Sequence, residues 1–386
     1  MAAEGPEAPM DEANEQADEQ NLDEAEGALE TLSAPLALAQ APVGGNAQTV
    51  RGWFDDAIAA VEPMMDGSLA AERDAALMFQ RMAKAENTRL AYRAAVRAWC
   101  AWCEHRGLPP LPACGADVAT FLAAERRRGL APNTLDLRRA AIRYLHRAAG
   151  CAVPTDDVCV AETLAGIRRD ATRKGELPAK KAAATASIIR QILAPIADDP
   201  RGLRDKALIL VGFAGALRRC ELAAIRVEHL EQTERGLRLT LPQTKGSQAA
   251  AVTIPLPYGH TELCPVRALS RWQDVAGITA GPVFRRIWLP KQLKEGAPPA
   301  PPRIGLDAIS SWAIASMVQA RATAAGFNGP HFGGHSLKRG ALTTGMEHGV
   351  HPADLKRLGR HKSFDVLGEY LEFGDLFERH ALKGVL

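Results

Sequence analysis

The C-terminal half of the sequence carries a tyrosine and two histidines at a spacing that suits nucleophilic chemistry. Tyr370 follows His361 by nine residues, and His335 lies further upstream. A phenol titrates near pH ~10, so at neutral pH it attacks only when a neighbouring group accepts or redistributes its proton. Imidazole titrates close to neutral pH and can take that part. These residue types would permit a covalent mechanism in which tyrosine attacks, although Tyr370 by itself could equally be an ordinary residue of an amphipathic helix.

Basic side chains in the same half of the chain suit a phosphate as the electrophile. Attack on a phosphodiester places negative charge on its non-bridging oxygens, which the planar fork of an arginine matches. Arg218, at the start of a predicted helix, is the candidate for this clamp through preorganised electrostatics. Glu221, one helical turn later, either holds the guanidinium or caps the helix. Lys245, in a predicted hairpin, can give a proton to the oxygen that departs from the phosphorus.

Five short fragments carry these residues in one order. They are Gly215-Ala-Leu-Arg-Arg-Cys-Glu-Leu222, Thr244-Lys245-Gly246, His335-Ser-Leu-Lys-Arg-Gly340, Leu358-Gly-Arg-His361 and Tyr370. In order and spacing they resemble the tyrosine recombinase (phage integrase) family, whose motifs are Gly-Leu-Arg-x-x-Glu-Leu, a hairpin lysine, His-x-x-Arg, and Gly-His followed nine residues later by the nucleophilic tyrosine. The fragment Asn87-Thr-Arg-x-x-Tyr92 resembles the opening of the family's core-binding domain.

The resemblance implies a site-specific DNA recombinase that cleaves and rejoins strands through a 3′-phosphotyrosyl intermediate. Tyr370 is then the nucleophile and Lys245 the general acid. The implied catalytic set is completed by Arg218, His335, Lys338 and His361. The implied partner is double-stranded DNA, and the implied assembly is a homo-oligomer, a tetramer on DNA and a monomer or dimer when free. No metal, ATP or other cofactor is expected. Accessory proteins, and the choice between integration, excision and resolution, stay open.

One position departs from the family pattern. The second arginine of the family falls three residues after the motif histidine, where this chain has Lys338 followed by Arg339. Either Lys338 binds phosphate as a point charge, or Arg339 substitutes for the missing arginine, or catalysis is impaired. Adjacent helical residues point about 100° apart, which favours Lys338. Arg360, in Gly-Arg-His, is a second variation, with a phosphate contact or a surface position as its alternatives.

Other functions compete with recombination. A recombinase-derived protein that binds DNA without cutting it would have the same motifs, with Lys338 as its lesion. A topoisomerase or a hairpin-forming resolvase would use the same chemistry. A metal-dependent nuclease is disfavoured, because no cysteine or carboxylate cluster accompanies the paired histidines at 331 and 335 or at 348 and 351. Cys100 and Cys103 each directly follow a tryptophan and have no matching second pair of cysteines, which indicates core packing.

The expected fold is mainly α with a small β-sheet. A helical, SAM-like core-binding domain is predicted at 68–174, with apolar side chains at helical spacing. A basic linker follows at 175–186, and then a mixed α/β catalytic domain of the tyrosine recombinase (DNA breaking-rejoining) type at 187–386. Thr88 and Thr134 are expected as helix N-caps. The predicted segments are helices at 69–84, 88–106, 115–129, 132–149, 158–173, 187–197, 202–214, 218–226, 263–276, 306–325, 336–348, 352–358 and 364–372, and a hairpin at 237–241 and 250–255.

The charge distribution favours a polyanionic partner for the body of the chain. Residues 1–50 hold eleven acidic and no basic side chains, which leaves 34 acidic against 47 basic residues in 51–386, a net charge of +13. The N-terminal 1–67 are expected to form an acidic, disordered arm. DNA phosphates are expected to contact basic faces of the first domain, formed by Arg89, Arg93, Arg97, Arg138, Arg139 and Arg143.

Composition also bears on location and assembly. No run of roughly 18 uncharged apolar residues is present, so no membrane span is expected. Seven scattered cysteines favour reduced thiols, and a prokaryotic, cytoplasmic, nucleoid-associated protein is expected. The apolar residues after the tyrosine have the spacing to pack on a neighbouring subunit or on their own; they are Leu371, Phe373, Leu376, Phe377 and Leu382.

Overall fold

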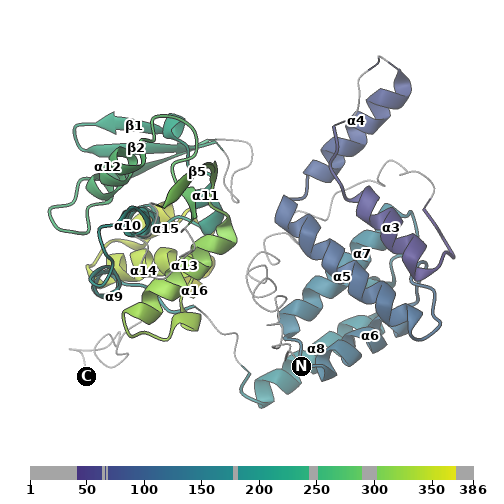
Figure 1. Cartoon of the computed structure of the whole chain (residues 1–386). Helices are drawn as coiled ribbons and strands as arrows, with labels where there is room; N and C mark the ends of the chain where they lie inside the picture. Colours follow the sequence, from purple (N-terminus) through teal and green to yellow (C-terminus); the bar gives the residue numbers. More distant parts are fainter. Residues whose placement is uncertain are drawn as a thin grey trace, which may run out of the picture. The chain divides into compact units, whose positions relative to one another are not determined.

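The computed structural model describes residues 41–62, 66, 68–176, 181–242, 251–288 and 302–370. The chain divides into two compact units, residues 1–178 and 179–386 (Figure 1). The first unit is helical and the second combines helices with two small sheets. The predicted class, mainly α with a small β component, is confirmed. No helix within the described ranges is long and apolar enough to cross a membrane.

The first unit is a bundle of amphipathic helices. Its elements are α3 (Ala47–Ala57), α4 (Leu69–Met82), α5 (Glu86–Glu104), α6 (Gly115–Arg127), α7 (Pro132–Ala148) and α8 (Val158–Arg173). The five helices predicted for this unit are confirmed to within two residues at each end. Their core holds Trp99 stacked on Trp102 with ring centres 5.6 Å apart and Phe121 edge-on to both. Cys100 and Cys103 are buried in this core, as core packing requires.

Helix α3 corrects the prediction of a disordered arm that reaches residue 67. Val50, Phe54 and Ile58 are spaced four apart, and all three are buried in the core of the bundle. The polar and acidic composition of the segment as a whole obscures this short apolar face. Residues 1–40, which carry all the acidic residues of the predicted arm before Asp55, lie outside the described residues.

Two predicted N-caps are also wrong. Helix α5 begins at Glu86 and α7 at Pro132, so Thr88 and Thr134 each lie at the third helical position. Proline suits the first turn, because its φ is already helical and its missing N–H would have no partner there. The residues that precede these helices, Ala85 and Ala131, provide no side-chain cap.

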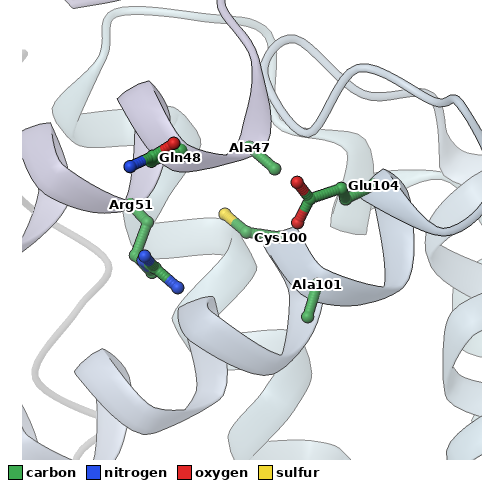
Figure 2. A pocket seen from close by; sticks show the side chains of 6 residues that line it. All are labelled: Ala47, Gln48, Arg51, Cys100, Ala101 and Glu104. Atoms are coloured by element: carbon green, nitrogen blue, oxygen red, sulfur yellow. The ribbon is translucent and has the colours of Figure 1, made fainter.

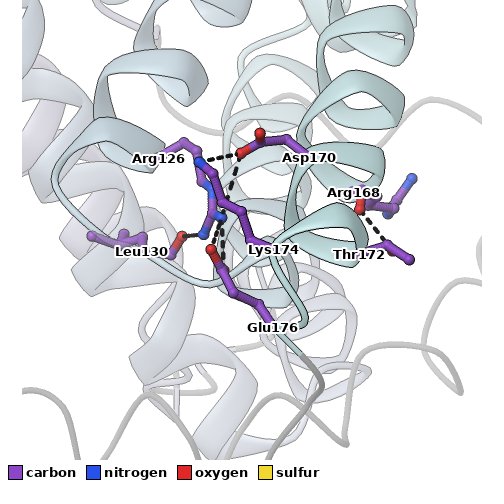
Figure 3. A network of polar contacts seen from close by, with 7 residues as sticks. All are labelled: Arg126, Leu130, Arg168, Asp170, Thr172, Lys174 and Glu176. Carbon is purple, nitrogen blue, oxygen red and sulfur yellow. Dashed lines mark hydrogen bonds and ion pairs between the residues drawn. The ribbon is translucent and has the colours of Figure 1, made fainter.

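Helix α8 is held to α6 by charge as well as by apolar packing. Arg126 on α6 ion-pairs with Glu176 at 2.6 Å and donates to the carbonyl of Leu130 at 3.1 Å (Figure 3). Asp170 on α8 lies 3.9 Å from the same guanidinium and 2.6 Å from Lys174. The network fixes the end of α8, where the first unit leads into the connecting segment.

The second unit is built around a buried central helix. Its helices are α9 (Ala186–Leu193), α10 (Pro200–Ala214), α11 (Arg219–Ala223), α12 (Pro265–Ala276), α13 (Ser311–Ala324), α14 (Gly334–Glu347), α15 (Pro352–Gly359) and α16 (Phe364–Tyr370). Helix α10 is buried from Gly202 to Asp205 and from Ala207 to Gly212, and it packs against α12 and α14. Its C-terminus is thereby fixed, and the loop that carries Arg218 starts from a rigid point.

The strands form two antiparallel sheets. They are β1 (Leu230–Thr233), β2 (Gly236–Leu241), β3 (Val252–Pro257), β4 (Arg285–Trp288) and β5 (Arg303–Ala308). The predicted hairpin is confirmed as β2–β3, with Leu239 opposite Ile254. Strands β1, β4 and β5 are additions, and β5 corrects the start of the helix predicted at 306, which begins at Ser311. Residues 289–301, between β4 and β5, lie outside the described residues.

Gly340 provides a direct test of how α14 is anchored. A Cβ at this position would lie 1.8 Å from the carbonyl oxygen of Ala184. The segment before α9 runs against α14 here, with the Ala184 N–H donating to Ser336 at 2.9 Å. We expect Gly340→Ala to lower the free energy of unfolding by about 2–3 kcal/mol, because the backbone at Ala184 must move to make room for the methyl group. Urea unfolding would measure the change. Gly166→Ala on α8, where nothing lies within 4 Å, should instead stabilise by up to about 1 kcal/mol. Equal effects of the two changes would contradict this packing.

Candidate active site

The Arg218 side chain is fixed by Glu221 at the start of α11. The Arg218 backbone N–H donates to Glu221 Oε2 at 2.9 Å, and Arg218 Nη1 lies 3.1 Å from Glu221 Oε1. Both alternatives for Glu221 are therefore realised, since it caps the helix and holds the guanidinium. Arg218 is 8% exposed, so little water competes for its donors.

Helix α14 contributes a buried cation beside the tyrosine. Lys338 is fully buried, and its Nζ lies 5.1 Å from the ring centre of Tyr370. His335, one helical turn earlier, is half-buried, and Arg339 is 4% exposed. The first turn of α14 lies against α11, because a Cβ on Gly334 would be 2.7 Å from Cβ of Arg219. The fold thus brings the His335 fragment to the Arg218 fragment.

His361 lies against the ring of Tyr370. Their ring centres are 4.5 Å apart, and the planes are tilted by 59°. His361 is 6% exposed, and its Nε2 is buried with no hydrogen-bond partner within the described parts of the chain. Gly359 makes room for this ring, because a Cβ there would lie 2.4 Å from His361 Cδ2. The nine-residue spacing seen in the sequence therefore places the imidazole on the phenol through the turn into α16.

Arg360 occupies neither of the positions expected for it. Its side chain is 10% exposed, and it donates to the carbonyls of Gly215 (2.9 Å), Ala216 (2.8 Å) and Leu358 (3.1 Å). It also ion-pairs with Glu221 Oε2 at 2.7 Å. This burial excludes a surface position. A phosphate contact is disfavoured, because protein acceptors engage both Nη atoms and the Nε, which has no hydrogen-bond acceptor within the described residues, is itself buried. No local pattern in the sequence indicates this arrangement, because Gly215 and Arg360 are 145 positions apart.

The cations around Glu221 and His361 set their protonation. Burial alone would raise the pKa of Glu221, but Arg360, Arg218, the Arg218 N–H and Lys338 outweigh it and hold the pKa below its usual value. Burial lowers the pKa of His361, and the charges of Lys338, Arg218 and Arg360 lower it further, to about 3. Glu221 is therefore ionised and His361 neutral at neutral pH.

This predicts a pH-dependent loss of stability. Between pH 6.5 and about 3 the unfolded chain binds a proton at His361 that the folded chain excludes, so stability falls as the pH falls through that window. We expect wild type to lose up to about 1.4 kcal/mol per pH unit more than His361→Gln when urea unfolding is compared at about pH 7 and pH 5. His146 in the first unit also has a pKa lowered by burial, but it contributes equally to both proteins. Identical pH slopes would contradict the assignment.

One predicted catalytic residue and the predicted packing segment after Tyr370 fall on residues that the structure does not describe. Lys245 belongs to residues 243–250, and the apolar C-terminal residues belong to 371–386; both stretches lie outside the described residues. Among the described residues, no group of three or more His, Cys, Asp or Glu could hold a metal ion.

Several arginines expected to contact DNA are engaged within the first unit. Arg93 and Arg97 lie 3.1 and 2.8 Å from carboxylate oxygens of Asp55, on the unpredicted helix α3. Arg143 lies 3.3 Å from Asp156. Arg138 is buried beside Glu125, 3.6 Å away, where it joins α6 to α7, and its contact with a phosphate stays a prediction. Arg89 and Arg139 are half-buried.

A cavity of the first unit lies between α3 and α5 (Figure 2). Gln48 and Arg51 of α3 line it together with Cys100 and Glu104 of α5. Burial raises the pKa of the Cys100 thiol to about 12, so it stays protonated at neutral pH and is no nucleophile. The chemistry-bearing groups therefore gather in the second unit.

Comparisons with known proteins agree with the two units. Residues 76–150 match the phage integrase N-terminal SAM-like domain, and residues 184–374 match the phage integrase family. An integrase/recombinase xerD homolog of Selenomonas ruminantium is 33% identical over 307 residues, 78% of this chain and 85% of the relative. The recombinase cre of Escherichia phage P1 is 25% identical over 305 residues, 75% of this chain and 85% of the relative.

Solved structures with the same fold include a recombinase bound to its substrate and an integrase in complex with DNA. A post-cleavage complex of the XerH site-specific recombinase with palindromic difH substrate gives a TM-score of 0.57 at 11% identity, over 90% of this chain and 98% of that chain. The Tn1549 transposon integrase in complex with transposon right end DNA gives a TM-score of 0.54 at 15% identity, over 80% of this chain and 96% of that chain. At these identities the likeness establishes the fold.

Proposed function

Since the chain belongs to the tyrosine recombinase (phage integrase) family, we propose that it is a site-specific recombinase that breaks and rejoins DNA through a 3′-phosphotyrosyl bond at Tyr370. The observation that carries the proposal is the convergence on one phenol of an imidazole, 4.5 Å away, and an ammonium, 5.1 Å away, from separate sequence motifs. Arg218 belongs to the same cluster, because its charge acts on His361.

In the proposed reaction, the Tyr370 oxygen attacks the scissile phosphorus. A phosphorus–oxygen bond forms to the phenol as the bond to the deoxyribose 5′-oxygen breaks. The phenolic proton passes to a histidine, His361 or His335, and Lys245 supplies a proton to the departing oxygen. Arg218 and Lys338 stabilise the charge that gathers on the non-bridging oxygens. The bond energy is kept in the phosphotyrosyl link, so religation needs no ATP or metal.

The low pKa of His361 fits a site in which the bound DNA phosphate supplies the negative charge that the free protein lacks. Three cations depress the pKa in the free protein, so the imidazole is a weak base there. A phosphate held by Arg218 and Lys338 would offset the positive charge around His361 and raise its pKa towards the ordinary value. Basicity would then increase when DNA is bound, which protects the free enzyme from unproductive chemistry.

The proposed partner is double-stranded DNA, bound by both domains, with 68–174 as the core-binding and 187–386 as the catalytic domain. One structural neighbour is described as a complex with transposon right end DNA and another as bound to difH substrate, which supports this partner. Exchange of two duplexes requires four active sites, so we propose a tetramer on DNA. Its proposed targets are sites in chromosomal or mobile-element DNA. The proposed compartment is the prokaryotic cytoplasm.

Arginines on α5 and α7 provide a test of DNA contact in the first unit. We expect Arg89→Gln and Arg139→Gln each to weaken binding similarly for all sequences, and to reduce the slope of log affinity against log salt by about 1. Arg168→Gln on α8 is the matched control, since this exposed guanidinium is paired with Asp136 at 2.7 Å. Unchanged salt slopes for both variants, measured by fluorescence anisotropy, would remove these residues from the interface.

A second candidate function follows from Lys338. With lysine in the place of the family's second arginine, the chain would hold DNA without cleaving it. Capture of covalent DNA–protein adducts from genomic DNA, followed by sequencing of the trapped ends, separates the candidates. Ends at a few recurrent sites support a recombinase, and ends scattered over the genome support a topoisomerase. Absence of adducts from the wild-type protein would favour the binding protein.

A further inference from the structure

Two strained turns meet at one side chain in the second unit. Among the described residues other than glycine, only Ala216 and Arg360 have a positive φ, 44° and 55°. Residues with a Cβ avoid this left-handed region, and strain of this kind persists where surrounding contacts impose it. The two residues are hydrogen-bonded to each other, because Arg360 Nη2 donates to the Ala216 carbonyl at 2.8 Å.

The Arg360 guanidinium joins three segments of the site. One nitrogen, Nη1, donates to the carbonyls of Gly215 and Leu358, and the other, Nη2, to Ala216 and to Glu221 Oε2. These acceptors belong to the loop after α10, the end of α15 and the start of α11. A planar fork can reach acceptors on several sides at once, which a lysine ammonium on a single stem cannot reproduce.

On each side of Arg360 lies a residue of the proposed reaction. Glu221 holds Arg360 with Oε2 and Arg218 with Oε1, so the two guanidinium groups share one carboxylate. His361 is the next residue in the chain, and its ring lies against Tyr370. The separation between the phosphate clamp and the tyrosine's neighbour is therefore set through Arg360.

We propose that Arg360 is a positioning residue, which fixes Arg218 and His361 relative to each other without touching DNA. The proposal rests on the proposed function, since it concerns the geometry of strand cleavage. A misplacement of about 1 Å at a reacting group can cost on the order of 100-fold in rate. Loss of Arg360 should thus act on the cleavage step and leave DNA affinity nearly unchanged.

The test is single-turnover cleavage of a nicked suicide substrate by the full-length protein at saturating DNA. Arg360→Gly suits it, because glycine accepts the left-handed backbone and leaves a space shaped for guanidinium. We expect the cleavage rate to fall about 100-fold with the Kd for DNA within about threefold of wild type. Millimolar guanidinium should restore the rate at least tenfold, which general destabilisation would not allow. Arg360→Lys should keep the low cleavage rate even with guanidinium. The control is Arg271 on α12, an exposed arginine paired with Asp198, and Arg271→Ala should cleave at the wild-type rate.

Other outcomes overturn the proposal. A wild-type rate for Arg360→Gly would mean that the turns hold without the guanidinium. A wild-type rate for Arg360→Lys would mean that charge alone matters, and a loss that guanidinium does not restore would indicate general disruption. If the wild-type protein itself forms no adduct, the proposed function fails and the positioning role fails with it. An active wild type with an equally active Arg360→Gly rejects the positioning role alone.

Discussion

Tyr370→Phe is expected to abolish covalent capture of DNA on a nicked suicide substrate. The change removes one oxygen, the proposed nucleophile, and should lower the cleavage rate by at least about 10⁴-fold. The ring itself is retained, so its packing against His361 at 4.5 Å and beneath Lys338 at 5.1 Å should persist. DNA affinity and the urea midpoint should therefore stay close to those of wild type. Adducts would be counted by denaturing gel electrophoresis of labelled DNA.

The matched control is the same substitution at another tyrosine. Tyr258 is 41% exposed, follows β3 and bonds to Gln232, away from the cluster around His361. Tyr258→Phe should form adducts at the wild-type rate. Persistent adducts in Tyr370→Phe would show that another side chain attacks the phosphorus, and the proposed mechanism would then be wrong.

Replacement of Lys338 is expected to have the second largest effect. Lys338→Ala should slow cleavage by about 10²–10³-fold at saturating DNA, the range seen when one preorganised donor to a developing oxyanion is lost. Lys338→Arg, which restores the residue type usual in the family, should keep the rate within about tenfold of wild type. Quenched-flow measurement of adduct formation would give both values.

Arg339→Ala is the companion to this experiment, because both residues are buried on α14 but point about 100° apart. We expect its main effect to be on the free energy of unfolding, since a buried guanidinium leaves its partners unsatisfied when removed. Abolished cleavage in Arg339→Ala alone, with Lys338→Ala still active, would give the second-arginine role to Arg339. Full activity in both variants would show that the site works without a second cation.

The sequence predicted the elements whose apolar residues repeat over several turns. Helices α5 to α8, with faces such as Tyr92, Val96, Trp99 and Cys103, were placed to within two residues. The hairpin β2–β3 was recognisable from alternation of apolar and polar residues around its turn. Helix α3 is not evident in the sequence, because its buried face has only three large apolar residues, centred on Phe54, among polar neighbours. The last three residues of strand β5 fall within the helix predicted from 306, because pairing with β4 is a tertiary interaction that local sequence does not report.

The sequence motifs predicted which residues belong to the candidate site, but they did not predict which atoms those residues contact. The ordered fragments brought Arg218, Lys338, His361 and Tyr370 into one hypothesis, and the fold places the last three within ring-contact distances. Arg360 escaped prediction because its role depends on carbonyls of a loop far away in the sequence. Arg138 appeared to be a surface cation until its burial with Glu125 was visible.

The central claim is that the phenolic oxygen at position 370 becomes bonded to DNA phosphorus. The most direct measurement is mass spectrometry of a trapped adduct after nuclease and trypsin digestion. The tryptic fragment 363–379 contains a single tyrosine, Tyr370. We expect this fragment to carry a nucleotide 3′-phosphate on that tyrosine. A nucleotide attached to any other side chain, or an unmodified fragment 363–379 from a protein that has cleaved its DNA, would contradict the account.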